Sequence, residues 1–162
     1  MDKEQKLNFI KKLEDKANEF NIVPELSESI LSFRPSPDAW TIREQIAHCL
    51  DVDIANFHRY RRGITDPGAT VLPLNPKWAE KLNYQASDVN VCISLIKILR
   101  KFIADHLKTI IDENWDEYYY IFGNEKKEKI NLNGTLQLYI DHIDFHKELI
   151  DRNIDIYKDT TK

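Results

Sequence analysis

Apolar residues recur at helical spacing in four long segments of the chain. In the first of them, one side of a helix would carry Leu7, Ile10, Leu13, Ala17 and Phe20. The same period of three to four residues returns three more times, and it predicts long helices near residues 3–20, 41–62, 86–112 and 135–153. The expected fold class is therefore all-α.

The second helix has the clearest boundaries. Thr41 and Glu44 fit the S/T-x-x-E capping box, in which each side chain satisfies a free backbone N–H, so the helix should start there. Gly63 is expected to end it. Residues 34–38 hold two prolines, each of which disfavours helix at the preceding residue, so this segment is predicted to be a loop.

Shorter stretches connect the long helices. A short helical piece is expected near residues 25–32, and residues 118–132 favour a hairpin that turns at Gly123-Asn124. Residues 63–85 link the second and third helices. A short link would make these helices antiparallel, but 23 residues can cross a bundle from end to end, so the two could run parallel.

The size and charge of the chain exclude several classes of protein. With 162 residues and 19.1 kDa, it is expected to form one domain over residues 1–162. A net charge of −4 and a pI near 5.7 argue against nucleic acid as a partner, and no apolar run approaches the ~18–20 residues of a membrane span. Cys49 and Cys92 are too few for a secreted disulfide scaffold and favour two buried free thiols. We therefore expect a cytoplasmic protein that binds neither nucleic acid nor a membrane.

Two histidines on the fourth helix carry the first candidate chemistry. His142 and His146 lie about 40° apart on a helical wheel, near the centre of the apolar arc. Imidazoles in the interior need polar partners. A pair spaced i, i+4 can bind one metal ion, because both rings project from the same strip of helix. The alternative is two core histidines bonded to buried water or carbonyls.

His48 is the natural third candidate, because it lies at the flank of the apolar arc of the second helix, as a pocket wall would. Asp53 falls amid the apolar face of the same helix. It could orient an imidazole that binds a metal, or it could bond to a buried donor. Asp51 and Asp53 are possible general bases, although both residues are more often structural.

Several other residues have a functional and a structural interpretation. The cationic run His58 to Arg62 suits a helix C-terminus, and it could also dock an anionic substrate or thiol cofactor. His106 has no histidine partner at helical spacing. Five aromatic residues could line a pocket or belong to the core: Trp40, Trp78, Tyr84, Trp115 and Tyr139.

These residues carry a resemblance to a known family. The segment from Trp40 to His48 resembles the W-S-x-x-E-x-x-x-H segment that opens the second helix of DinB-like proteins, and Arg34-Pro35-Ser36-Pro37 before it is typical of the family. His142 and His146 resemble the H-x-x-x-H of its last helix. The resemblance implies a four-helix bundle in up-down-down-up order with long connections, and often a homodimer.

The resemblance also implies a divalent metal site made by His48, His142 and His146. Relatives include transferases and isomerases that use bacillithiol, mycothiol or glutathione, some of them with a further C-terminal domain. The residue types do not distinguish zinc, nickel or iron. We expect nitrogen–metal distances of roughly 2.0–2.3 Å, and a His48 ring more than about 8 Å from the other two would exclude a shared ion. Because only neutral histidine coordinates, affinity is expected to fall as the pH drops through the ordinary histidine pKa of about 6.5.

Two classes of function follow from the sequence. One is a metal-dependent transferase of the thiol S-transferase type, or a hydrolase, that acts on a small-molecule substrate, with a low-molecular-weight thiol as a possible cofactor. The other is a non-catalytic helical module that binds a small ligand or a protein partner, with its metal structural or absent. The open coordination position of a three-histidine ion favours the first class. The absence of an obvious acid–base residue favours the second.

Overall fold

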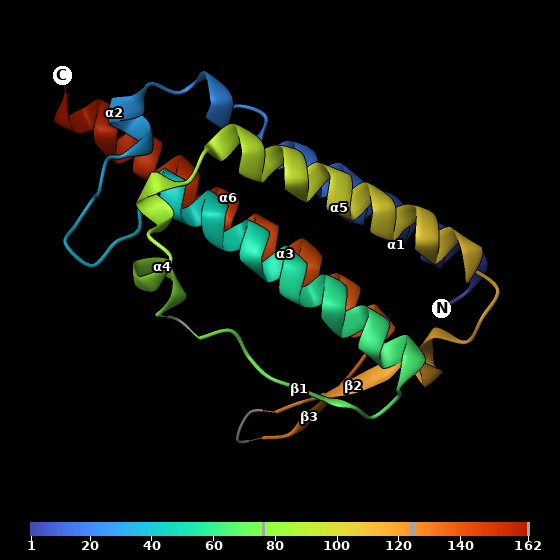
Figure 1. Cartoon of the computed structure of the whole chain (residues 1–162). Coiled ribbons are helices and arrows are strands. Elements are labelled where there is room, and N and C mark those ends of the chain that lie inside the picture. The colour runs from blue at the N-terminus through green and yellow to red at the C-terminus, as the bar shows by residue number, and fades with distance from the viewer. Residues whose placement is uncertain (76, 124–125, 162) are drawn as a thin grey trace.

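Four long helices form the body of the protein (Figure 1). The computed structural model describes residues 1–75, 77–123 and 126–161. The long helices are α1 (Lys3–Asp15), α3 (Ile42–Thr65), α5 (Val89–Thr109) and α6 (Leu132–Thr160). Shorter helices, α2 (Glu28–Leu31) and α4 (Trp78–Lys81), lie in the connections, with 3₁₀ turns at Lys16–Phe20, Val23–Glu25, Tyr84–Ala86 and Trp115–Glu117. The predicted helical segments are confirmed, with shifted ends.

A polar side chain caps the N-terminus of each long helix. Asp2 and Thr41 form capping boxes with Gln5 and Glu44, as the sequence predicts for the second pair. Asp88 accepts from two backbone N–H groups of α5, and Asn131 accepts from the N–H of Gly134 in α6. These caps explain why α5 begins three residues later than the hydrophobic period alone indicates.

A small sheet accompanies the bundle, so the strict all-α expectation is wrong in this detail. The predicted hairpin is present as β2 (Tyr119–Phe122) paired antiparallel with β3 (Glu128–Asn131). The predicted turn residue Asn124 lies outside the described residues. A two-residue strand, β1 (Thr70–Val71), adds to β2 in parallel.

Gly63 does not end its helix, which corrects the second boundary prediction. Helix α3 continues to Thr65, and a Cβ atom on Gly63 would lie 3.3 Å from the backbone carbon of Tyr119. The glycine therefore serves the close approach of β2 to α3 rather than a helix end.

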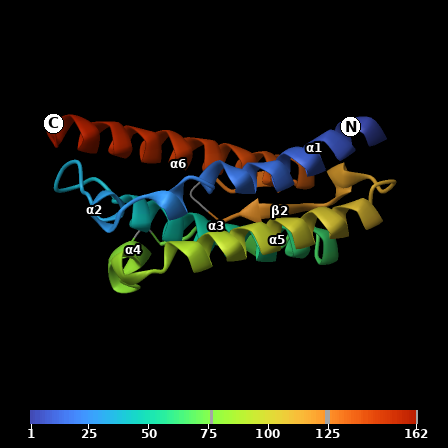
Figure 2. The same ribbon diagram turned by 90° about the horizontal axis from the view of Figure 1, so that it is seen from above.

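Contacts between the long helices define their directions. Thr41 bonds to Gln85, Asp53 to Arg100, and Tyr60 to His106, so α3 runs parallel to α5. On the other side of α3, Gln45 contacts His146 whereas Tyr139 contacts Asp53, which makes α6 antiparallel to α3. Figure 2 shows α1 with α6 in one layer and α3 with α5 in the other, and the two termini at opposite ends.

A buried ion pair joins the four helices at the middle of the bundle. Arg100 of α5 donates to both carboxylate oxygens of Asp53, at 2.6 and 2.8 Å. It also donates to the backbone oxygens of Tyr139 in α6, at 2.9 Å, and of Leu13 in α1, at 3.4 Å. Both charged side chains are almost wholly buried. Apolar clusters lie on either side of this pair.

Candidate metal centre

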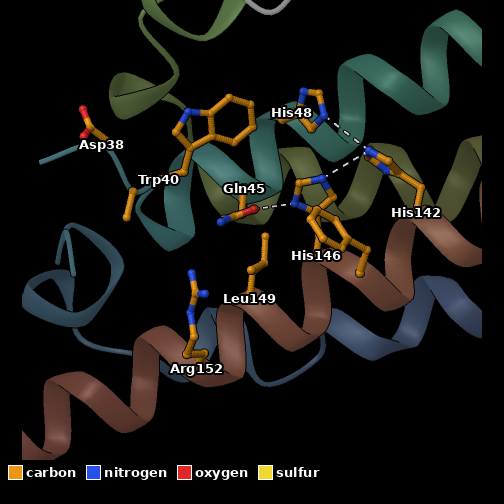
Figure 3. A pocket seen from close by; sticks show the side chains of 10 residues that line it. Asp38, Trp40, Gln45, His48, His142, His146, Leu149 and Arg152 are labelled. Carbon is orange, nitrogen blue, oxygen red and sulfur yellow. Dashed lines mark hydrogen bonds between the residues drawn. The ribbon is translucent and has the colours of Figure 1, made fainter. Parts of the chain in front are cut away.

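The three histidines of the predicted site converge between α3 and α6 (Figure 3). His48 comes from the first half of α3, and His142 and His146 come from successive turns of α6. The Nε2 atom of His142 lies 3.3 Å from that of His48 and 3.2 Å from that of His146. Each ring offers one nitrogen to a group whose members all lie within 4.8 Å of one another. The rings are therefore close enough to share one ion.

The donor set fits a divalent metal ion. In a tetrahedral site with metal–nitrogen bonds of ~2.0–2.1 Å, neighbouring nitrogens lie roughly 3.3–3.4 Å apart. The two Nε2–Nε2 distances of 3.3 and 3.2 Å are close to this spacing. Three imidazoles also leave one coordination position open for water or substrate.

Gln45 orients His146 from behind. Its side-chain oxygen forms a very short contact with Nδ1 of His146, and the glutamine is itself buried. With Nδ1–H donating to this oxygen, the lone pair of His146 is on Nε2, which faces the other two rings. Sequence reasoning missed Gln45. The only signal was a polar residue one turn before His48, on the apolar side of the helix.

Burial keeps the three imidazoles neutral. It lowers the pKa of His142 to about 3, helped by the nearby His146 and His48, and lowers the pKa of His146 to about 4, helped by His48. It lowers the pKa of His48 as well. Within the described residues, the buried Nδ1 of His142 has no hydrogen-bond partner. Neutral rings are the form that coordinates a metal ion.

These lowered pKa values predict acid sensitivity of the metal-free protein. A histidine with a lower pKa in the folded than in the unfolded chain binds fewer protons when folded, so stability decreases as the pH falls below ~6.5. Each such histidine contributes about 1.4 kcal/mol per pH unit in this window. Between pH 7 and pH 5, we expect wild type to lose about 2 kcal/mol more unfolding free energy than His142→Gln, measured by urea denaturation with chelator present. Equal losses in the two proteins would contradict this account.

A cavity of about 460 Å³ opens beside the histidines. His48, His142 and His146 form one part of its wall, and Figure 3 shows Asp38 and Arg152 on the side away from His142. The Trp40 ring meets the His48 ring edge-on, with centroids 4.9 Å apart. The cavity is within the size range of small-molecule sites. Of the aromatic pocket candidates, only Trp40 lines this cavity; Tyr84, Trp115 and Tyr139 are buried in the core, and Trp78 is exposed.

The candidate acid–base residues have structural partners. Asp53 pairs with the buried Arg100. Of the two roles considered for Asp53, bonding to a buried donor is therefore the one that the structure shows, and orienting an imidazole is not. Asp51 accepts a very short hydrogen bond from the Tyr84 hydroxyl. Burial is the main reason that the pKa of this phenol is raised, and the bond to Asp51 raises it further. Glu44 caps α3 and pairs with Arg34 at 2.8 Å.

The remaining candidates from the sequence lie outside the centre. In the cationic run, Arg62 pairs with Asp66 and the Arg61 guanidinium lies over the Phe57 ring, so the run does not form one cluster. His106 contacts the Tyr60 hydroxyl at 3.4 Å. Cys49 and Cys92 are free and buried, as predicted.

Comparison with known proteins agrees with the arrangement of the helices. Residues 17–150 match the sequence profile of the DinB superfamily. The chain belongs to the DinB superfamily. Its fold is similar to that of YfiT from Bacillus subtilis, described as a probable metal-dependent hydrolase with an unusual four-helix bundle topology, with a TM-score of 0.85 and 24% identity over 94% of this chain and 87% of YfiT. No curated protein matches the sequence. In the described residues, no helix has the length and apolar character that crossing a membrane requires.

Proposed function

We propose that this DinB-superfamily protein is a divalent-metal-dependent enzyme that acts on small molecules, as a hydrolase or as a thiol-dependent S-transferase. The observation that carries the proposal is the convergence of His48, His142 and His146 at the wall of an open cavity. The description of YfiT as a probable metal-dependent hydrolase supports the same general class. The ion is zinc, nickel or iron.

The residues around the histidines have separate tasks in this proposal. When bound, a divalent ion supplies a nucleophile near neutral pH by lowering the pKa of a coordinated water or thiol. Gln45 fixes the tautomer and orientation of His146. Trp40 and Phe145 shield the histidines on the cavity side, because their rings meet those of His48 and His146 edge to face. Arg152 on the cavity wall provides a positive charge for an anionic substrate or thiol.

One observation favours the alternative, a non-catalytic module with a structural metal. Asp38 is the only carboxylate among the described residues that line the cavity, and in Figure 3 it lies away from the rings. On this side of the centre, the described residues therefore place no carboxylate beside the rings. An ion held by the three histidines would activate the nucleophile itself without a carboxylate base, so the enzyme remains the favoured proposal.

An activity screen distinguishes the two candidates. Untagged protein loaded with zinc, nickel or iron is assayed against ester, amide and epoxide substrates, and against a small electrophile with several low-molecular-weight thiols. We expect metal-dependent turnover that His142→Ala abolishes. Turnover that survives in His142→Ala would contradict the enzyme, and a metal-loaded protein inactive throughout the panel would favour the module.

Further parts of the proposal concern architecture and location. The helix directions defined by the contacts of α3 with α5 and α6 support the up-down-down-up order. The shared ion pair at the middle of the bundle supports a single domain over residues 1–162. The two buried free cysteines support a reducing, cytoplasmic location. The net charge of −4 supports partners other than nucleic acid, and we propose no membrane partner.

We also propose a homodimer through the outer side of α3 and α5. An apolar groove of about 280 Å³ on this α3–α5 face is lined by Leu50, Ile54, Phe57, Leu95, Ile98, Leu99 and Phe102. Several of these side chains are exposed, Ile98 to 66%. Contiguous apolar surface of this kind marks interaction sites. A second copy of the same face, related by a two-fold axis, would cover this apolar surface on both chains.

Ile98→Glu tests the homodimer. Two copies of a charge placed at the centre of a self-complementary face repel each other and lose apolar burial. Light scattering at high micromolar concentration should give twice the chain mass for wild type and 19.1 kDa for Ile98→Glu. A wild-type particle of 19 kDa would count against the dimer.

A further inference from the structure

In the described part of the chain, Arg59 is a buried cation without an acidic partner. Only 8% of the residue is exposed, and within the described residues no carboxylate lies within 4.0 Å of its guanidinium. Its Nη1 donates to Oδ1 of Asn56 and its Nη2 to the backbone oxygen of Leu72, both at 2.8 Å. The guanidinium lies 5.1 Å from the Phe122 ring centroid. Hydrogen bonds to neutral groups hold this side chain in place, but they leave its charge uncompensated, which is costly inside a protein.

A second cavity lies directly beside this arginine. It has a volume of about 430 Å³ and lies between α3, α6 and the small sheet. Apart from Asn56, Arg59, Asp141 and His142, its wall is apolar: Val52, Phe122, Ile130, Leu138 and Phe145. Burial of the guanidinium lowers the pKa of Arg59, but the group remains charged at neutral pH. The cavity therefore combines a fixed positive charge with an apolar lining.

The same cavity reaches the candidate metal centre. His142 lines both this cavity and the one beside Trp40, and Phe145 stands at the wall of both. Along α3, Asn56 follows His48 by eight positions, a rise of about 12 Å. A ligand whose anionic end bonds to Arg59 would extend along the apolar wall toward the three histidines.

We propose that Arg59 and Asn56 bind the carboxylate of an elongated, largely apolar substrate that occupies this cavity. The placement of its far end at the histidines rests on the proposed function. A guanidinium binds a carboxylate with paired N–H bonds, and Asn56, whose Oδ1 accepts from Arg59, can turn its N–H bonds toward the same ligand. A single cation matches a monoanion. The carboxylate of Asp141, exposed on the wall, disfavours a more highly charged ligand such as a phosphate dianion.

A chain-length series on the zinc-loaded protein tests the inference. The probes are 3-mercaptopropionate and 8-mercaptooctanoate, each with the alcohol of the same length, and binding is measured by calorimetry. The thiolate is a ligand for zinc and the carboxylate a ligand for Arg59. In wild type, we expect the eight-carbon acid to bind about 10-fold more tightly than its alcohol, which is the expected range for a charged hydrogen bond. The three-carbon pair is too short to reach and should show no preference.

The preference should disappear in Arg59→Met and persist in the matched control Arg62→Met, because Arg62 is exposed and pairs with Asp66 on the surface. Arg59→Gln, whose side-chain amide can still donate a hydrogen bond, serves if the methionine variant does not fold. An unchanged preference for the acid in the Arg59 variants would overturn the inference.

Octanoate binding to the metal-free protein separates this inference from the proposed function. If octanoate binds wild type but not the Arg59 variants while zinc does not bind, the carboxylate site stands and the metal centre fails. If zinc binds but octanoate shows no dependence on Arg59, the carboxylate site fails and the metal centre stands.

Discussion

Arg100→Met should lower the free energy of unfolding by about 3–5 kcal/mol, the cost of breaking a buried ion pair by removing one partner. The substitution leaves the Asp53 carboxylate buried, and it also removes the donors to the backbone oxygens of Tyr139 and Leu13. Urea denaturation at pH 7 measures the change. A decrease in the free energy of unfolding below about 1 kcal/mol would show that this ion pair does not stabilise the bundle as proposed.

The double variant Asp53→Leu with Arg100→Met separates the unpaired charge from the lost packing. Replacing a whole buried pair with apolar residues of similar volume is often neutral or stabilising. We therefore expect the double variant to recover a large part of the stability that Arg100→Met loses. As a surface control, Lys101→Met removes only an exposed pair with Asp105, and its effect should be far smaller than that of Arg100→Met.

His142→Ala should abolish stoichiometric metal binding and the stability that binding supplies. An ion held by α3 and α6 binds the folded chain only, so at a free zinc concentration 100-fold above the dissociation constant it adds about 2.7 kcal/mol. Wild type should show this gain in thermal unfolding with zinc, and His142→Ala should not.

His58→Ala and His106→Ala are the matched controls for this experiment. Neither His58 nor His106 belongs to the histidine group of the centre, and His106 contacts Tyr60 instead. Both variants should therefore keep the full stabilisation by zinc. Loss of the zinc effect in either control, or its persistence in His142→Ala, would contradict the assignment.

Much of the bundle follows from local patterns in the sequence. The apolar period and the Thr41–Glu44 capping box locate the helices, because both act over one or two turns. The inward pair His142 and His146 also follows from helical spacing. The wheel position of His48 made it the third candidate, and the DinB resemblance implied that the three share one ion. The structure adds that the three rings meet, which no single helix can indicate.

Features that depend on contacts between distant segments could not be predicted from the sequence. The wheel position of Asp53 showed a buried acid but not its partner Arg100, which lies 47 residues away. Gly63 was predicted to end its helix because glycine is common there. Its real role, the close approach of β2, is a contact between distant segments that the sequence does not show. Gln45 and Arg59 are ordinary polar residues in the sequence, and only burial and their neighbours in space give them a role.

X-ray absorption spectroscopy of the zinc-loaded, untagged protein tests the central claim most directly. The account predicts one zinc ion per chain with three imidazole nitrogens at ~2.0–2.1 Å and a light atom from water in the remaining position. Substitution of His48, His142 and His146 by alanine should remove that spectrum. A zinc ion bound by sulfur or carboxylate ligands, or wild-type protein that binds no stoichiometric zinc, would contradict it.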